Sequence, residues 1–239
     1  MAVISAAGLD HRALNEAIRR ETACTVTGCL GQRFIGSGMK DRDIELEGIP
    51  GNALGAYLTG ARITVRGNAQ DAVGDTMNDG RIVIHGSVGY AVGYAMRGGH
   101  ILVKGSAGYR AGIHMKEYRE KKPAIVIGGR TGSFLGEYQA GGVIVVLGLH
   151  EDGKPIVGNF PCTGMHGGKM FLRGNIGAID FPKNVTLRSA TEADMAELLP
   201  LLSEYCDAFG TDPALLTREP FTVIVPDSAN PYKQLYVAN

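Results

Sequence analysis

A short segment in which apolar and polar positions alternate recurs seven times along the chain. Each copy has apolar residues at its first and third positions, variable residues at its second and fourth, and glycine at its fifth. Alternation with a period of two predicts a β-strand, because successive side chains of a strand point to opposite faces. The copies are Ile44–Gly48, Ile63–Gly67, Ile82–Gly86, Ile101–Gly105, Ile125–Gly129, Ile144–Gly148 and Met170–Gly174.

The spacing of these strands predicts a solenoid. The closing glycines at 48, 67, 86 and 105 are 19 residues apart, and the later steps of 24, 19 and 26 indicate a loop insertion in two coils. The period excludes a helical repeat, and propeller blades need roughly 40 residues. We therefore expect an all-β protein: a single-stranded, right-handed parallel β-helix of about seven 19-residue coils, with short helical N- and C-terminal extensions.

Glycine is abundant, at 35 of 239 residues, which is roughly twice its average usage. Many of these glycines follow a second pattern, G-x-x-G-x-x-x-G, that repeats with the coils. Glycine permits a positive φ and a close approach of backbones. Because a phosphate-binding loop would normally occur once, we interpret the recurring glycines as coil corners. They are Gly48, Gly55, Gly67, Gly74, Gly86, Gly93, Gly105, Gly112, Gly129, Gly136, Gly148 and Gly174.

The outward strand positions change character along the chain. They are polar in the first coils, but from Val83 to Phe171 one outward position per coil is apolar. A sheet that is apolar on both faces must be covered on both. The cover is either an end of this chain or a partner subunit, and the residues of the candidate partner face are Val83, Leu102, Val126, Val145, Leu147 and Phe171.

The two ends read as separate from the coils, which gives three segments: residues 1–27, a helix and lead-in; residues 28–186, the β-helix; and residues 187–239, a helical extension with a terminal strand. We expect them to plug the open ends of the solenoid, the alternative being an arm that docks on another subunit. The predicted features are a helix over Arg12–Glu21 capped by Asp10, a capping box over Ser189–Glu192, a helix kinked or divided at Pro200, a short helix over Pro213–Leu216, and a strand over Phe221–Val225.

Charge and apolar content exclude two classes of partner. The 24 basic and 24 acidic side chains balance, whereas nucleic-acid binders usually carry a basic surplus. No apolar stretch approaches the ~18–20 residues of a spanning helix, and no secretion signal opens the chain. We therefore expect a cytoplasmic protein without nucleic-acid or membrane partners. Four cysteines are too few for a disulfide scaffold in a chain of this length.

The usual catalytic signatures are missing. The sequence holds no P-loop, no G-x-G-x-x-G that opens a helix, no G-x-S-x-G elbow and no HExxH. One cluster stands out, because Cys162 and His166 are four residues apart and could form a thiolate pair or two metal ligands. Without an evident third partner, a structural corner is the favoured interpretation. We predict no catalytic, cofactor-binding or metal residue in this chain.

Most of the chain, from about Gly28 to Asp180, resembles a known family. The coils, and the segment Gly31–Gly38 that leads into the first of them, are similar to the C-terminal β-helix domain of glutamate synthase. They are also similar to the β-helical component of formylmethanofuran dehydrogenase. Three segments look particularly like the stand-alone version, in which the large glutamate synthase subunit is split into separate polypeptides: Gly112–Lys116, Phe134–Glu137 and Gly164–Gly168.

The resemblance implies a function. In glutamate synthase an amidotransferase domain with an N-terminal cysteine hydrolyses glutamine, an FMN and iron–sulfur domain uses the ammonia, and the β-helix holds the two in place. This chain begins Met-Ala and has no cluster-binding cysteine run. The implied role is a non-catalytic scaffold for glutamine amidotransferase and FMN/iron–sulfur partner subunits. The alternatives are a formylmethanofuran dehydrogenase component and an enzyme that uses Cys162 and His166.

Overall fold

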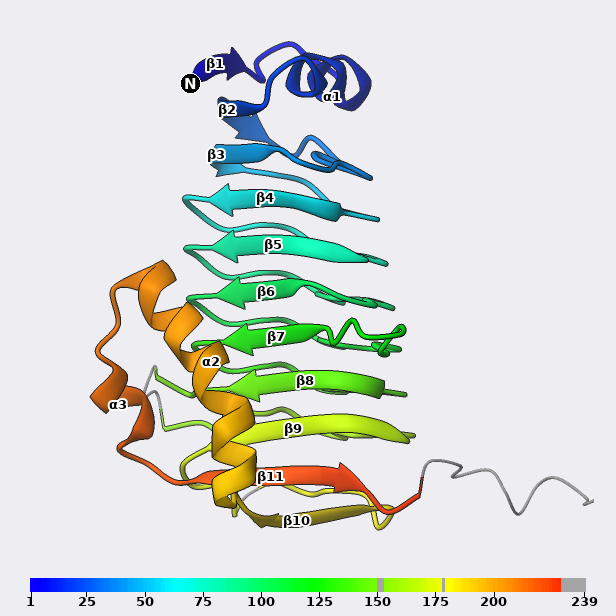
Figure 1. The fold of residues 1–239 in the computed structure, drawn as a ribbon, viewed down its shortest axis with the longest axis vertical. Coiled ribbons are helices and arrows are strands. Elements are labelled where there is room, and N and C mark those ends of the chain that lie inside the picture. Colours follow the sequence, from blue (N-terminus) through cyan, green and yellow to red (C-terminus); the bar gives the residue numbers. More distant parts are fainter. Residues whose placement is uncertain (150–152, 178, 229–239) are drawn as a thin grey trace, which may run out of the picture.

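The computed structural model, which describes residues 1–149, 153–177 and 179–228, is an upright stack of strands (Figure 1). Its described strands form one sheet in the order β1-β2-β3-β4-β5-β6-β7-β8-β9-β11-β10. The strands are β1 (Ala2–Ser5), β2 (Ala23–Leu30), β3 (Asp43–Ile49), β4 (Thr59–Val65), β5 (Asp79–Ile84), β6 (His100–Val103), β7 (Ala124–Ile127), β8 (Ala140–Val146), β9 (Gly167–Arg173), β10 (Val185–Ser189) and β11 (Phe221–Pro226). The helices are α1 (His11–Arg19), α2 (Glu192–Phe209) and α3 (Pro213–Thr217).

The seven recurring segments form the parallel strands β3 to β9, which confirms the predicted β-helix. Ile44 lies in register with Ile63, and the same row continues strand by strand to Met170. The side chains of this row are fully buried, as are those of the row that begins at Leu46. In Figure 1 the strands nearest the viewer run from right to left as the chain descends, so the coil is right-handed.

The sheet extends beyond both ends predicted for it at residues 28 and 186. β1 and β2 add two parallel strands before the first recurring segment, with Cys24 opposite Ile44 and Val26 opposite Leu46. Cys24–Gly28 follows the same alternating pattern, but a cysteine at its first position hides the match. At the other end β11 pairs antiparallel with β9, and β10 pairs with β11. The terminal segments therefore continue the sheet.

Helix α1 lies at the N-terminal end of the stack (Figure 1). Asp10 caps it as predicted, since its side chain accepts hydrogen bonds from the backbone N–H groups of Arg12 and Ala13. Leu14 and Ile18 are fully buried in the cluster that fills the solenoid. α1 thus covers the apolar interior that the first coils would otherwise leave open.

Helix α2 departs from two predictions. It is continuous from Glu192 to Phe209 and runs through Pro200 undivided. Pro200 lies on the exposed side of the helix, where water can bond the carbonyl that proline leaves without a donor. The capping box consists of Thr191 and Asp194, because Ser189 still belongs to strand β10.

The predicted corner glycines fall into two groups. Five occupy one column of left-handed backbone, where an added Cβ would lie 2.3–2.8 Å from an inward side chain two strands further along. They are Gly55, Gly74, Gly93, Gly112 and Gly136. Four others (Gly67, Gly86, Gly105 and Gly129) lie where an added Cβ would approach the preceding coil within 3.2 Å. Gly48, Gly148 and Gly174 have positive φ as well.

Substitution in the left-handed column is expected to destabilise the solenoid from inside. Gly93 has φ +68°, and an alanine Cβ there would lie 2.3 Å from Ile125 Cδ1. Gly93→Ala combines backbone strain with overpacking, so we expect the free energy of unfolding to fall by about 2–4 kcal/mol. Denaturant unfolding followed by circular dichroism measures it.

Gly8→Ala is the matched control. Gly8 has a similar φ of +76°, but nothing lies within 4 Å of its added Cβ. It should lose only about 1 kcal/mol, from backbone strain alone. Equal losses in the two variants would show that the contact with Ile125 is unimportant.

Candidate functional site

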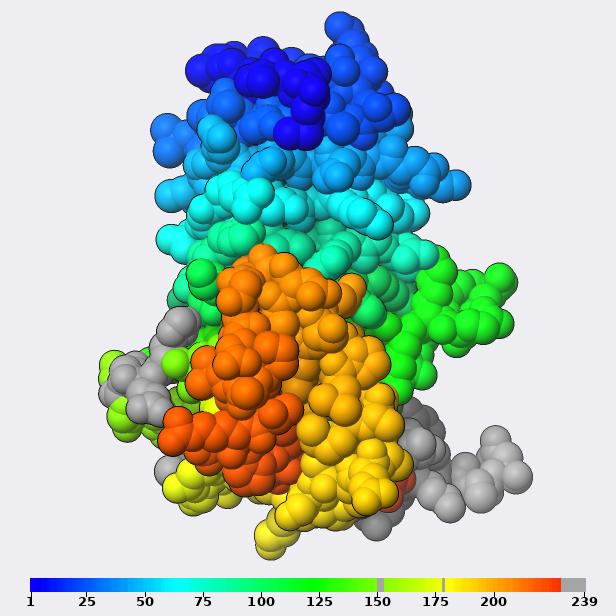
Figure 2. All heavy atoms as spheres, turned by 60° about the vertical axis from the view of Figure 1, so that its left-hand side comes forward, coloured from blue at the N-terminus to red at the C-terminus, as the bar shows by residue number. Residues whose placement is uncertain are grey.

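The apolar outer face of the sheet is covered by this chain itself. Helix α2 lies across the C-terminal half of the sheet, with α3 beside it (Figures 1 and 2). Leu198, Leu202 and Tyr205 of α2 form one buried cluster with the outward sheet residues. The prediction of a partner face here is therefore wrong, because its residues are buried beneath the chain's own helix and the strands beside it: Val83, Leu102, Val126, Val145, Leu147 and Phe171.

Ion pairs fasten both ends of α2 to the sheet. Lys169 Nζ on β9 donates to Asp194 Oδ1 at 3.0 Å and to Glu197 Oε2 at 2.6 Å. Near the other end, the His100 ring donates from Nδ1 to Glu204 Oε2 at 2.6 Å. This bond to His100 lowers the pKa of Glu204. These contacts fix the position of α2 along the coils.

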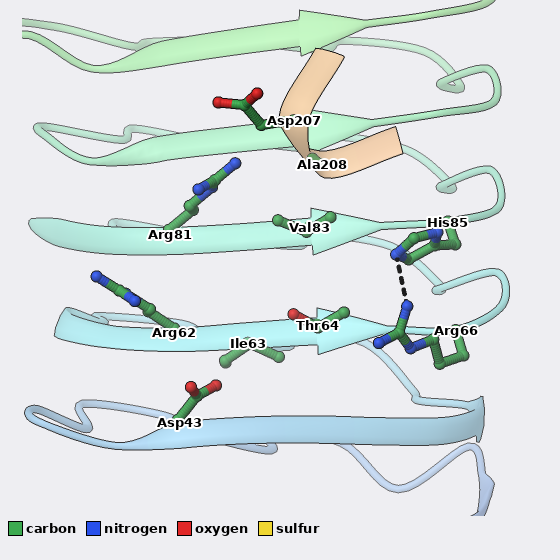
Figure 3. Close-up of a pocket in the computed structure, with 10 residues that line it drawn as sticks. All are labelled: Asp43, Arg62, Ile63, Thr64, Arg66, Arg81, Val83, His85, Asp207 and Ala208. Atoms are coloured by element: carbon green, nitrogen blue, oxygen red, sulfur yellow. Dashed lines mark hydrogen bonds between the residues drawn. The ribbon is translucent and has the colours of Figure 1, made fainter. Parts of the chain in front are cut away.

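A polar pocket of about 310 Å³ lies where α2 ends and the outer sheet face becomes exposed (Figure 3). Asp43, Arg62 and Arg81 stand in register on neighbouring strands and form one wall. Asp207 of α2 also lines the pocket. Sequence reasoning missed this group, although in three coils a charged residue directly precedes the first apolar strand position.

His85 at the opposite side of the pocket is held in place by its neighbours. Arg66 Nη1 lies 3.2 Å from His85 Nε2. Because arginine only donates, Nε2 accepts, and the ring proton lies on Nδ1. Burial lowers the pKa of His85, and its ring packs edge-on against Phe209 at 5.3 Å. With its free lone pair occupied by Arg66, this imidazole is poorly placed to act as a general base.

The structure gives Cys162 a packing role. Its side chain is 0% exposed, and burial raises the pKa of the thiol to about 12, far from the reactive range. Cys162 occupies the left-handed glycine column, with φ +59°, and its sulfur lies 3.9 Å from Met170 Sδ. His166 Nδ1 lies 3.0 Å from the Gly164 carbonyl oxygen. Among the described residues no group of three His, Cys, Asp or Glu side chains could hold a metal ion.

Three comparisons relate this chain to known proteins. Residues 8–227 match the GXGXG motif family. The chain belongs to the GXGXG motif family. The glycines of the motif are those that let one coil approach the next and turn inside it. A curated relative of this GXGXG protein is the uncharacterized protein MJ1350 of Methanocaldococcus jannaschii, 43% identical over 98% of this chain and 95% of the relative.

The fold of this GXGXG protein also occurs in a solved complex. A chain in the crystal structure of the formyltransferase/hydrolase complex (FhcABCD) from Methylorubrum extorquens, in complex with methylofuran, has a TM-score of 0.67 and 20% identity. The match covers 95% of this chain and 91% of that one. At this identity the comparison establishes a shared fold. No helix in the described ranges is both long enough and apolar enough to cross a membrane.

The anchoring of α2 can be tested at Asp194, which is 2% exposed. Its carboxylate pairs with Arg188, which holds its pKa well below the ordinary range, and accepts from Thr191 and Lys169. Asp194→Asn removes one charge of a buried network, so we expect the free energy of unfolding at pH 7 to fall by about 3 kcal/mol. Because the folded pKa is lowered, the wild-type contribution is complete above pH 4 and is lost only below it.

Urea unfolding at pH 7 and pH 5 measures this loss. Glu192→Gln, in the same turn of α2 but exposed, makes the matched change of charge and should alter stability by less than about 0.5 kcal/mol. A similar effect of both variants would mean that Asp194 is not the anchor.

The packing role of Cys162 predicts a silent thiol. In the folded protein at pH 8, we expect Cys162 to resist a water-soluble thiol reagent for hours, because it is buried and protonated. Peptide mass spectrometry before and after denaturation measures its modification. Rapid labelling in the native state would refute the assignment.

Proposed function

We propose that this chain is a non-catalytic structural subunit of a multi-subunit enzyme. The observation that carries the proposal is the unbroken inner row from Cys24 to Met170, fully packed and aligned in register. Such a stack is a stiff rod, and its buried thiols and engaged imidazoles give no activated group. Rigid rods of this kind suit the task of holding other subunits at fixed positions.

Two kinds of enzyme are candidates for the partners. The likeness to a chain of the formyltransferase/hydrolase complex, over nearly all of both chains, favours a role in an assembly of the formylmethanofuran dehydrogenase type. We place this candidate first because it rests on the whole fold. In such an assembly the chemistry would belong to the partner subunits.

The second candidate is a split glutamate synthase. It is supported by the resemblance of the segments at Gly31–Gly38, Gly112–Lys116 and Gly164–Gly168. Its partners would be a glutamine amidotransferase subunit and a subunit that carries FMN and iron–sulfur clusters. This chain would hold no cofactor.

Purification of the tagged chain from its native cells tests the proposal. We expect a complex much larger than the 25.3 kDa chain, with partner subunits identified by mass spectrometry. Molybdenum or tungsten in the complex would mark the first candidate, and FMN with a glutamine-hydrolysing partner the second. Recovery only as a free chain or a homo-oligomer would contradict the proposal.

The same preparation separates a scaffold from an enzyme that uses its own thiol. Cys162→Ala should leave both the composition and the turnover of the complex unchanged, because Cys162 only fills space beside Met170. Loss of turnover in a correctly assembled complex would restore the alternative that Cys162 and His166 are catalytic.

A further inference from the structure

Aromatic rings gather on the turns of four successive coils. These turns span residues 90–95, 109–114, 133–138 and 159–164, between the second side of each coil and the next strand. They carry seven rings that lie at the surface, which we call the aromatic stripe: Tyr90, Tyr94, Tyr109, His114, Phe134, Tyr138 and Phe160. Tyr109 is 49% exposed and Phe160 is 61% exposed.

The rings are ordered against one another from coil to coil. Tyr90 stacks on Tyr109 with ring centroids 5.1 Å apart, and His114 stacks on Tyr138 at 5.2 Å. Phe134 lies 5.4 Å from Phe160. The stripe is therefore a preorganised surface, and little side-chain entropy remains to be lost when a partner covers it.

The fold itself does not require aromatic residues here. Phe134 and Phe160 have left-handed backbone (φ +63° and +57°), a conformation that costs energy for bulky residues. The same position is alanine in three earlier coils, at Ala53, Ala72 and Ala91. Because alanine satisfies the coil, the phenylalanines must serve something other than folding.

The surroundings of the stripe indicate the chemistry of what binds it. A shallow depression of about 320 Å³ adjoins Tyr109 and is lined by Arg130 and Lys154. Arg110 lies over the Phe134 ring at 5.1 Å and pairs with Glu137. Tyrosine, phenylalanine and arginine are the residues enriched at the centres of protein interfaces. The zero net charge of the chain argues against a nucleic acid.

We propose that the aromatic stripe is the docking surface for a partner subunit of the enzyme. The partner presents apolar side chains to the rings and at least one carboxylate to the depression beside Tyr109. This inference rests on the proposed function and adds the face on which assembly occurs. The sheet face is closed by α2, so the stripe offers the exposed aromatic surface that assembly needs.

Binding to the partner identified by co-purification, expressed and purified alone, tests the docking surface. In the double variant Tyr109→Ala/Phe134→Ala we expect affinity to fall at least about 30-fold, as for the loss of interface anchors. Lys154→Glu should weaken binding further at low salt than at high salt, because it opposes a carboxylate. The control is Tyr118→Ala, a tyrosine 47% exposed in the insertion after β6, which should bind like wild type.

Folding and accessibility are measured in the same proteins. Alanine occurs naturally at the position of Phe134 in other coils, so the double variant should keep its thermal midpoint within a few degrees. Hydroxyl-radical footprinting of the intact complex should protect Tyr90, Tyr94 and Tyr109 relative to the free chain, and leave Tyr118 labelled.

The outcomes separate the two proposals. If the wild-type chain recruits no partner, the proposed function fails and the docking surface fails with it. If the complex forms but the double variant binds normally and the tyrosines stay labelled, only the docking surface is overturned. Protection in a homodimer or by a single-stranded nucleic acid, and not by the partner, would likewise overturn it.

Discussion

The structure depends on backbone hydrogen bonds that join each coil to its neighbours in a fixed register. The strands pair residue by residue from β1 to β9 with local irregularities, and the turns are bonded between coils as well, as from Gly93 N to the Val73 carbonyl. Because coils lie only ~4.8 Å apart, every side chain has an equivalent directly above and below it. Whatever fits one coil must fit the next, which explains the apolar rows inside and the glycine columns at the turns.

A stack of this kind has two problems that its ends must solve. The first and last strands expose unpaired backbone, and an outer face rich in valine and phenylalanine needs a cover. α1 closes one end of the interior, and β11 and β10 pair antiparallel beyond β9. α2 returns along the sheet and buries the apolar half of its outer face. The C-terminal extension therefore completes the domain, which leaves the turns as its distinctive free surface.

The repeat made most of the fold predictable, because period-two alternation and equal spacing need no tertiary information. The strand at Cys24–Gly28 escaped because cysteine is not an obvious core residue, although it is fully suited to one. The position of α2 could not be predicted, since an apolar outer face attracts an internal helix and a partner equally well. The pocket at Arg62 and Arg81 depends on where α2 ends, so it too lay beyond the sequence pattern.

Cys162 has a consequence for the length of the rod. In each earlier coil, the corresponding position must be glycine because an inward side chain two strands further along occupies the space. At position 162 a side chain fits and points toward Met170, since the parallel stack ends at β9. Adding another coil would demand glycine there. One residue therefore acts as a terminator, and the reach of the rod between its attached subunits is countable in whole coils.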